Sequence, residues 1–224
     1  MPTIDSTAEH AQWRLACFDL DGTLVSGTTI CQHLGDHFGH GAVVRDLAIA
    51  YAQGKMGFRE LAEKDAVFYR GRSTREIALA LESLPLIPGI EQTMSRLREN
   101  GLKILLTTIT WTFAARIVAQ RFSLDGWSGY TMGETKDGLL SGSVEHHFDE
   151  VAKRKFVEEY CLNRGISLNN VFAVGDSRSD IPLFEVVGHS IALNATDIAR
   201  KSSSCSLDTD NLLDVLGSVP GLGL

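Results

Sequence analysis

The sequence predicts an α/β fold, in which a Rossmann-like parallel sheet is flanked by helices and a helical segment is inserted after the first strand. Short apolar runs typical of buried strands recur along the chain, with helical stretches between them. Residues 25–86 instead show amphipathic helical patterns broken by glycines, without a convincing strand pattern. We therefore expect an α/β core domain of residues 1–24 and 87–224 and a helical domain of residues 25–86.

Four apolar runs are the expected strands of the core, at residues 15–20, 103–108, 171–174 and 190–193. Pro88-Gly89 marks the start of the helix before the second run, and Gly101 is its expected C-cap. A later helix is expected over roughly residues 153–164, ending at Gly165 before the third run. Strands that alternate with helices in this way favour a parallel sheet.

Two local patterns predict turns and helix starts away from these runs. Ser73 followed by Glu76 is typical of a capping box at the start of a helix. Residues 133–144 alternate polar and small side chains around Asp137-Gly138, which predicts a β-hairpin. The space between Thr108 and Lys153 has room for one helix, one strand and this hairpin only, so we expect no second inserted domain.

Composition and charge narrow the function classes. The 224 residues are 44% hydrophobic and 22% charged, as in a soluble globular chain, and no stretch has the roughly 18 apolar residues of a membrane span. The net charge of -7 argues against a nucleic-acid or anionic-membrane partner. Four scattered cysteines and an N-terminus without a signal-peptide pattern favour the cytoplasm. The oligomeric state is not predicted.

The first apolar run ends in a pair of acids, Asp19 and Asp21. Side chains two apart on a strand point the same way, so the two carboxylates are expected to share a site. Gly22 allows a sharp turn directly after them. Both acids are then expected at the carboxyl edge of the sheet, where open α/β folds bind their ligands.

Further polar residues follow the later runs. The second run ends in Thr107 and Thr108, whose hydroxyls can donate to a phosphoryl oxygen, and Lys153 and Lys155 can each bring a positive charge. The third run is followed by a second acid pair, Asp176 and Asp180. Carboxylates grouped at one sheet edge suit a hard cation such as Mg²⁺.

The order acid pair, hydroxyl, lysine, acid pair, each at or just beyond a strand, resembles the haloacid dehalogenase superfamily of phosphohydrolases. The best matches are residues 18–25, 88–108 and 149–195. The inserted helical segment resembles the cap of the superfamily's phosphoserine phosphatase-like branch. The resemblance implies a cap over a sheet-edge site and hydrolysis of a phosphate ester.

The resemblance also implies a role for each acid. Asp19 would be the nucleophile that accepts the phosphoryl group, and Asp21 the acid that protonates the leaving alcohol and then activates water. Mg²⁺ would bind Asp19, the backbone carbonyl of Asp21 and Asp176, with Asp180 supporting the metal site. An acid at position 21 further favours phosphatase over dehalogenase or ATPase chemistry.

Two assignments are choices between neighbours. The spacing from Gly101 favours Thr108 over Thr107 as the hydroxyl that contacts the phosphate. The distances to Gly165 and to the second acid pair favour Lys153 over Lys155 as the lysine.

The expected substrate is a small phosphorylated metabolite, bound in part by Thr28 and Ile109 together with the hydroxyl and the lysine. Several positions depart from the phosphoserine enzymes. Thr28 stands for their glutamate and Asp65 for their cap arginine, while Ile109-Thr110 replaces a glycine pair and Ser179 an asparagine. These departures make phosphoserine itself a doubtful substrate, because an unpartnered buried charge costs several kcal/mol.

Other functions are kept as alternatives. A phosphoserine phosphatase and a phosphomutase share the same motifs. A receiver-type phospho-acceptor also combines acids, a hydroxyl and a lysine, but the order of motifs here and the helical insertion disfavour it. A non-catalytic binding homologue is disfavoured because every chemical position is filled.

Two conspicuous groups are given structural interpretations. His33, His37 and His40 have a helical spacing compatible with a metal, but no cysteine or acid cluster completes a zinc site. Trp111 follows the second run closely, and packing in the core or at the domain interface is favoured over contact with substrate.

Overall fold

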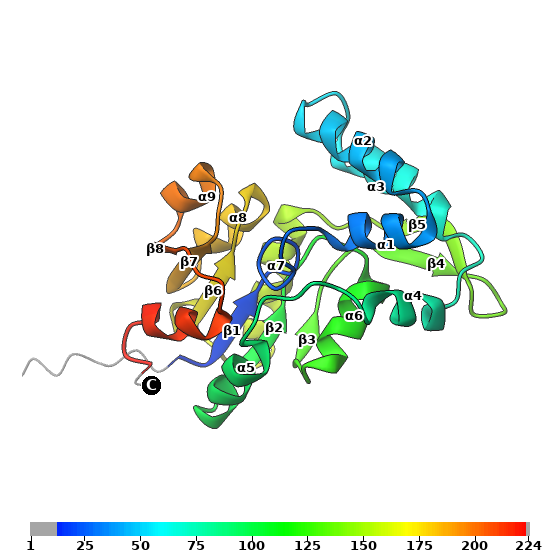
Figure 1. Ribbon diagram of the computed structural model, residues 1–224. Helices are drawn as coiled ribbons and strands as arrows, with labels where there is room; N and C mark the ends of the chain where they lie inside the picture. The colour runs from blue at the N-terminus through cyan, green and yellow to red at the C-terminus, as the bar shows by residue number, and fades with distance from the viewer. Residues whose placement is uncertain (1–12, 223–224) are drawn as a thin grey trace, which may run out of the picture.

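The computed structural model describes residues 13–222, and its centre is a six-stranded sheet in the order β3-β2-β1-β6-β7-β8 (Figure 1). All neighbouring strands in this sheet run parallel. The strands are β1 (Leu15–Phe18), β2 (Lys103–Leu106), β3 (Gly126–Trp127), β6 (Val171–Gly175), β7 (His189–Leu193) and β8 (Cys205–Leu207). The predicted α/β fold class is confirmed, and each expected strand lies within two residues of its predicted start.

Nine α-helices are described in residues 13–222. They are α1 (Ile30–Phe38), α2 (Gly41–Ala52), α3 (Phe58–Ala66), α4 (Thr74–Leu81), α5 (Ile90–Glu99), α6 (Thr112–Arg121), α7 (Glu150–Leu162), α8 (Ile181–Phe184) and α9 (Asp197–Ser202). Short 3₁₀ helices are η1 (Val67–Tyr69), η2 (Leu168–Asn170), η3 (Arg178–Asp180) and η4 (Leu212–Ser218).

The sheet is buried on both faces, and β1 shows how. Ala16 and Phe18 belong to a cluster with side chains of α5, α6 and η4, whereas Leu15 and Cys17 pack with side chains of α7 and α8. Successive residues of a strand point to opposite faces, so an uninterrupted apolar run is what two covered faces require. The carboxyl ends of β1 and β6 meet because the two strands are adjacent and parallel.

Helices α1 to α4 form a group beside the carboxyl ends of the strands, on the far side of the molecule from α8 and α9 (Figure 1). The predicted hairpin is also confirmed: β4 (Thr131–Glu134) and β5 (Leu140–His146) pair antiparallel. It packs against the inserted helices, where Gly71 N donates to Leu140 O at 2.8 Å and Leu140 N donates to Arg72 O at 2.8 Å. The inserted helices therefore pack with a hairpin that comes from the middle of the chain.

Local sequence signals set several helix starts. The Ser73 side chain accepts from Glu76 N while the Glu76 carboxylate accepts from Ser73 N, so the predicted capping box is present on α4. Helix α7 begins at Glu150, earlier than the expected 153, because the Asp149 carboxylate caps it by accepting from Ala152 N at 2.8 Å. Lys153 then lies at the end of the first turn, where its N donates to Asp149 O at 2.8 Å.

The four cysteines are free. Within residues 13–222, none of the helices is both long and apolar enough to span a bilayer. The N-terminal features that favoured the cytoplasm lie mostly in residues 1–12, outside the described part of the chain, as does the start of the predicted 1–24 segment.

Candidate active site

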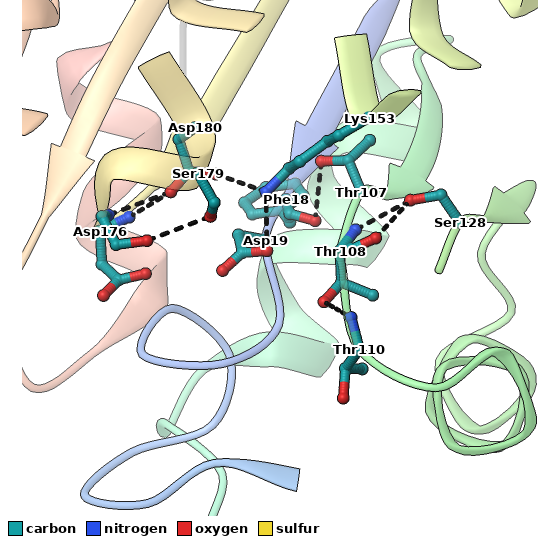
Figure 2. A network of polar contacts seen from close by, with 11 residues as sticks. Phe18, Asp19, Thr107, Thr108, Thr110, Ser128, Lys153, Asp176, Ser179 and Asp180 are labelled. Atoms are coloured by element: carbon teal, nitrogen blue, oxygen red, sulfur yellow. Dashed lines mark hydrogen bonds and ion pairs between the residues drawn. The ribbon is translucent and has the colours of Figure 1, made fainter. Parts of the chain in front are cut away.

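Two acids meet where β1 and β6 end. Asp19 N donates to Val174 O at 2.9 Å, which continues the ladder between the two strands. Asp176 follows β6 directly, and one carboxylate oxygen each of Asp19, Asp176 and Asp180 lies within 4.8 Å of the others (Figure 2). The two predicted acid pairs, far apart in the sequence, are thus brought to one sheet edge.

Lys153 places its ammonium between Asp19 and Asp180 of this carboxylate cluster. Its Nζ is 2.8 Å from Asp19 Oδ1 and 2.5 Å from Asp180 Oδ1, and its side chain is fully buried (Figure 2). Lys155, on the same helix, is exposed. Of the two lysines that the sequence offered, the structure brings Lys153 to the acids.

Asp180 holds the loop after β6. Its Oδ2 accepts from Asp176 N and from Ser177 N, each at 3.0 Å, while its Oδ1 contacts Lys153. A Cβ at position 175 would lie 2.2 Å from Asp180 Cγ, so Gly175 is required for this close approach. Asp180 therefore orients both the backbone of Asp176 and the lysine, as expected of a supporting residue.

Asp21 lies in the turn after β1, at the boundary with the inserted helices. Its Oδ1 accepts from Ile30 N, the first residue of α1, at 2.6 Å. Gly22 has φ +84°, and a Cβ there would come within 2.4 Å of Asp176 Oδ2, so a side chain at this position would collide with the second acid pair. Burial raises the pKa of Asp21 to about 6, a value suited to a proton donor near neutral pH.

The two candidate hydroxyls differ in direction. Thr107 Oγ1 donates to Phe18 O at 3.2 Å, within the sheet. Thr108 lines the cavity described below, and its backbone is fixed because Thr108 N donates to Ser128 Oγ at 2.9 Å and Ser128 Oγ donates to Thr108 O at 2.8 Å (Figure 2). Only Thr108 has access to a ligand there.

The cluster carries more negative than positive charge. Three carboxylates face one ammonium, and Asp176 Oδ1 is buried without a hydrogen-bond partner among the described residues. Burial, together with the charge of Asp180, raises the pKa of Asp176 to about 7, and burial raises that of Asp19. Lys153 is buried too, yet Asp180 and Asp19 raise its pKa, which keeps it charged. An oxygen-only donor set with excess negative charge fits a hard divalent cation such as Mg²⁺.

A cavity of about 410 Å³ opens from the carboxylates toward the inserted helices. Five of the site residues named from the sequence lie in its wall, namely Asp19, Asp21, Thr108, Ile109 and Asp176, whereas Lys153 and Asp180 are not among its lining residues. The opposite wall comes from α2 and α3, through Val44, Leu47, Ala48, Tyr51, Phe58, Leu61 and Asp65. The cavity therefore combines an acidic floor with a largely apolar roof.

Thr28 is a predicted binding residue that the structure does not bring to this cavity. Thr29 and Cys31 line it instead. Thr28 is half-buried in the loop before α1, and its hydroxyl donates to Thr29 O at 3.4 Å. The turn before α1 ends at its N-cap, Thr29, so Thr29 rather than Thr28 lies in the cavity wall.

Asp65 is nearly fully buried, at 1% exposure, and forms a direct link between α3 and the loop after β2. Trp111 Nε1 donates to Asp65 Oδ2 at 2.7 Å. Trp111 is fully buried and stacks on Phe113 with centroids 5.6 Å apart, so the expected packing role at the interface is what the structure shows. Burial raises the pKa of Asp65 to about 6.

Other residues of the cavity were not singled out from the sequence. Tyr51, Phe58 and Tyr130 give it an aromatic side, and Arg178 lies at its edge. Arg178 Nη2 donates to Tyr51 Oη at 2.7 Å, which joins the loop after β6 to α2. Single aromatic residues on amphipathic helices carry no pattern that separates cavity walls from ordinary core positions.

The three histidines at helical spacing have separate environments. His33 Nε2 lies 2.9 Å from Ala80 O, His37 packs on Phe38, and His40 stacks on Phe68 with centroids 4.4 Å apart. The carboxylate cluster is the one group of potential metal ligands found in the described part of the chain.

Comparison with known proteins places this geometry in a family. The model of haloacid dehalogenase-like hydrolases matches residues 16–185. A phosphoserine phosphatase of Archaeoglobus fulgidus is 28% identical over 201 residues, covering 89% of this chain and 58% of the relative. A phosphoserine phosphatase of Methanocaldococcus jannaschii is 26% identical over 207 residues, covering 91% and 96%.

Solved structures share this fold. A solved structure of a phospho-aspartyl intermediate analogue of phosphoserine phosphatase superposes with a TM-score of 0.79 at 24% identity, covering 92% of this chain and 99% of that one. The chain spans just over half the length of the A. fulgidus relative and nearly all of the M. jannaschii one. The resemblance to the superfamily noted in the sequence is confirmed: the chain belongs to the haloacid dehalogenase-like hydrolase family.

Proposed function

We propose that the protein is a magnesium-dependent phosphatase that hydrolyses the phosphate monoester of a small metabolite through an aspartyl-phosphate intermediate. The observation that carries this proposal is the carboxylate cluster at the cavity floor, where Asp19 contacts the buried Lys153 while Asp21 lies at the cavity wall. The family to which the chain belongs consists of hydrolases, and the relatives named phosphoserine phosphatase support a phosphatase among them.

Two half-reactions balance with these residues. In the first, a carboxylate oxygen of Asp19 attacks phosphorus, the bond from phosphorus to the alcohol oxygen breaks, and Asp21 gives its proton to that oxygen. In the second, Asp21 takes a proton from water as the water oxygen attacks phosphorus, which releases phosphate and restores the Asp19 carboxylate. Lys153 and the Thr108 hydroxyl stabilise the phosphoryl oxygens throughout.

Asp19, the backbone carbonyl of Asp21 and Asp176 would hold Mg²⁺, and Asp180 would support them. The ion supplies the positive charge that lets an anionic nucleophile approach an anionic ester. The chain's own contribution is to keep these oxygens together, through the β1–β6 pairing and through the backbone bonds that Asp180 accepts.

Residues 25–86 are proposed to act as the cap domain, with 1–24 and 87–224 as the core. The cap side of the cavity is apolar, so the bound ester is shielded from bulk water when the two parts are in contact. Direct links already join them: Asp21 to Ile30, Asp65 to Trp111, and Tyr51 to Arg178. A cytoplasmic location stays a prediction from the sequence.

Phosphoserine phosphatase is the second candidate function. The names of the relatives favour it. An acid at position 65 and the absence of Thr28 from the cavity wall argue for a different leaving group.

An assay with a generic aryl phosphate tests the reaction class. We expect hydrolysis that requires Mg²⁺, stops on chelation, and falls by at least about 1,000-fold in Asp19→Asn. Asp210→Asn removes the same charge from an exposed loop and should keep full activity. Activity that survives Asp19→Asn or chelation would overturn the proposed mechanism. Phosphoserine as the clearly best of a metabolite panel would establish the second candidate.

A further inference from the structure

Asp65 is a buried carboxylate that takes no part in the proposed half-reactions. One of its oxygens accepts from Trp111, whereas Oδ1 is buried without a hydrogen-bond partner among the described residues. The residue nevertheless lies in the wall of the same cavity as Asp19. An unpaired buried carboxylate is costly, so a group that supplies the missing partner would bind there with advantage.

The surroundings of Asp65 favour a cation as that partner. Phe58 and Tyr130 line the cavity with their rings 5.6 Å apart in an edge-to-face arrangement, and Tyr51 packs against Phe58 at 5.8 Å. Aromatic faces next to a carboxylate attract ammonium groups through the ring quadrupole as well as through charge. The Tyr69 hydroxyl lies near Asp65, and it too is buried without a hydrogen-bond partner among the described residues.

The charge of the cavity wall disfavours a leaving group with a carboxylate. The acidic and basic residues of the lining are Asp19, Asp21, Asp65, Glu150, Asp176 and Arg178. The single cation among them, Arg178, already donates to Tyr51 Oη and has Glu150 at 4.0 Å. Five acids against one cation in the described lining disfavour an amino acid's carboxylate, and Asp65 would repel it.

We propose that Asp65 selects the leaving group, and that the substrate is the phosphate monoester of an amino alcohol, with a cationic nitrogen at Asp65, an apolar spacer along α2 and α3, and no carboxylate. This inference rests on the proposed phosphatase function and names its substrate class. Asp65 binds the part of the substrate that leaves, while the reacting phosphate lies at the other end of the cavity, at Asp19. Burial that raises the pKa of Asp65 to about 6 still leaves it ionised at neutral pH.

The test compares matched esters that differ in one terminal group. Aminoalkyl phosphates of increasing chain length are assayed against alkyl phosphates in which a methyl group replaces the ammonium. At the chain length that spans the cavity, we expect kcat/KM for the amino ester to exceed that of its methyl isostere by at least about tenfold, equivalent to roughly 1.4 kcal/mol. Phosphoserine should be poorer than the amino ester of equal length.

Variants at position 65 test whether Asp65 causes the preference for the amino ester. Asp65→Asn keeps an acceptor for Trp111 Nε1 but removes the charge, and should bring the ratio of amino to methyl ester close to one. Asp65→Glu extends the carboxylate into the cavity and should shift the preferred chain length to a shorter ester. Glu63→Gln removes a charge from the exposed side of the same helix and should leave the ratio unchanged.

A binding measurement covers the case in which the Asn variant does not fold. Free amino alcohols should inhibit the wild-type enzyme at least about tenfold more strongly than alkanols of the same length. No preference for the amino compounds in either measurement, or a ratio that Asp65→Asn leaves unchanged, overturns the inference. In that event, Asp19-dependent hydrolysis of the aryl phosphate would show that the proposed reaction still stands, whereas its absence would show that the reaction class is wrong.

Discussion

Lys153 is a buried cation whose charge is balanced by neighbouring carboxylates. It is fully buried between Asp19 and Asp180, so its ammonium compensates carboxylates that are otherwise held together in a desolvated site. Burying a charge is tolerated when partners surround it, and removal of one partner leaves the others uncompensated. The Lys153 side chain therefore contributes both to the stability of the active-site region and to the proposed phosphatase reaction.

Replacing this lysine should affect both properties. We expect Lys153→Met to lower the free energy of unfolding by about 3–5 kcal/mol, because two buried carboxylates lose their partner, and to lower kcat/KM by at least about 100-fold. Urea unfolding with a chelator present measures the first effect and the aryl phosphate assay the second. Lys155→Met, exposed on the same helix, should stay within about 0.5 kcal/mol of wild type. Equal effects of the two substitutions would contradict the assignment.

The two adjacent threonines allow a second comparison at the residue scale. Thr108→Val removes a hydroxyl from the cavity wall and should lower kcat/KM by about 10–100-fold. It should also cost about 1 kcal/mol of stability, because Thr110 N loses its acceptor. Thr107→Val instead removes the bond to Phe18 O inside the sheet and should cost about 1 kcal/mol of stability with activity largely kept. Kinetics and urea unfolding of both variants measure these effects, and the reverse kinetic pattern would favour Thr107 as the phosphate contact.

At the scale of elements, the site is assembled from segments that each supply one part. The ends of β1 and β6 supply the two acid pairs, the first turn of α7 supplies the lysine, and α3 supplies Asp65 on the opposite wall. The Asp65–Trp111 bond holds α3 to the loop after β2, and its environment makes the attachment sensitive to pH.

The direction in which stability changes with pH follows from the raised pKa of Asp65. An aspartate in the unfolded chain loses its proton near pH 4, whereas Asp65 in the folded protein keeps it until about pH 6. Between these values the unfolded state binds fewer protons, so the contribution of Asp65 to stability decreases as pH rises, and the cost reaches about 3 kcal/mol above pH 6. Asp65→Asn should therefore gain stability relative to wild type by about that amount from pH 4 to pH 7.

Urea unfolding of both proteins across this range measures the difference. The other acids of the site titrate in both proteins and cancel when the two curves are subtracted. A difference in unfolding free energy that stays constant with pH would show that Asp65 is not held in a desolvated environment. Asp46→Asn, at an exposed position of α2, provides the control with a flat difference.

At the scale of the whole molecule, α2 and α3 form one side of the cavity and the sheet edge the other, while the β4–β5 hairpin packs against the inserted helices (Figure 1). The site joins parts of the chain that come from both ends of the sequence. A cation at the carboxylate cluster would tie β1 to the loop after β6 and so stabilise the folded protein as a whole.

Magnesium should therefore raise the melting temperature. At about 100 times its dissociation constant the ion contributes about 2.7 kcal/mol, which corresponds to roughly 5–10 °C for a chain of this size. Asp176→Asn removes a ligand whose Oδ1 has no partner among the described residues, and most of the shift should disappear. Asp210→Asn should keep it. Differential scanning calorimetry with Mg²⁺ and with a chelator gives the comparison, and an equal shift in both variants would contradict the proposed metal site.

The sequence by itself determined the α/β class, the strands of the core, the hairpin and the placement of Asp19 and Asp21 on one side of a strand end. These features depend on local periodicity and on turn residues, such as Gly22, whose effects extend over a few positions. Adjacency of β1 and β6 also follows common rules for parallel sheets, which is why the two acid pairs could be expected at one edge.

Only the tertiary structure decided which residue before α1 lines the cavity: Thr29 does so rather than Thr28, because of the turn that ends at Thr29. The spacing in the sequence already favoured Lys153 over Lys155, and the packing of α7 adds the ion pairs of Lys153 with Asp19 and Asp180. The Asp65–Trp111 bond joins residues 46 positions apart. Contacts of this kind depend on how whole elements pack against one another, and a shift of one residue along a helix turns a side chain by about 100°, from cavity to solvent.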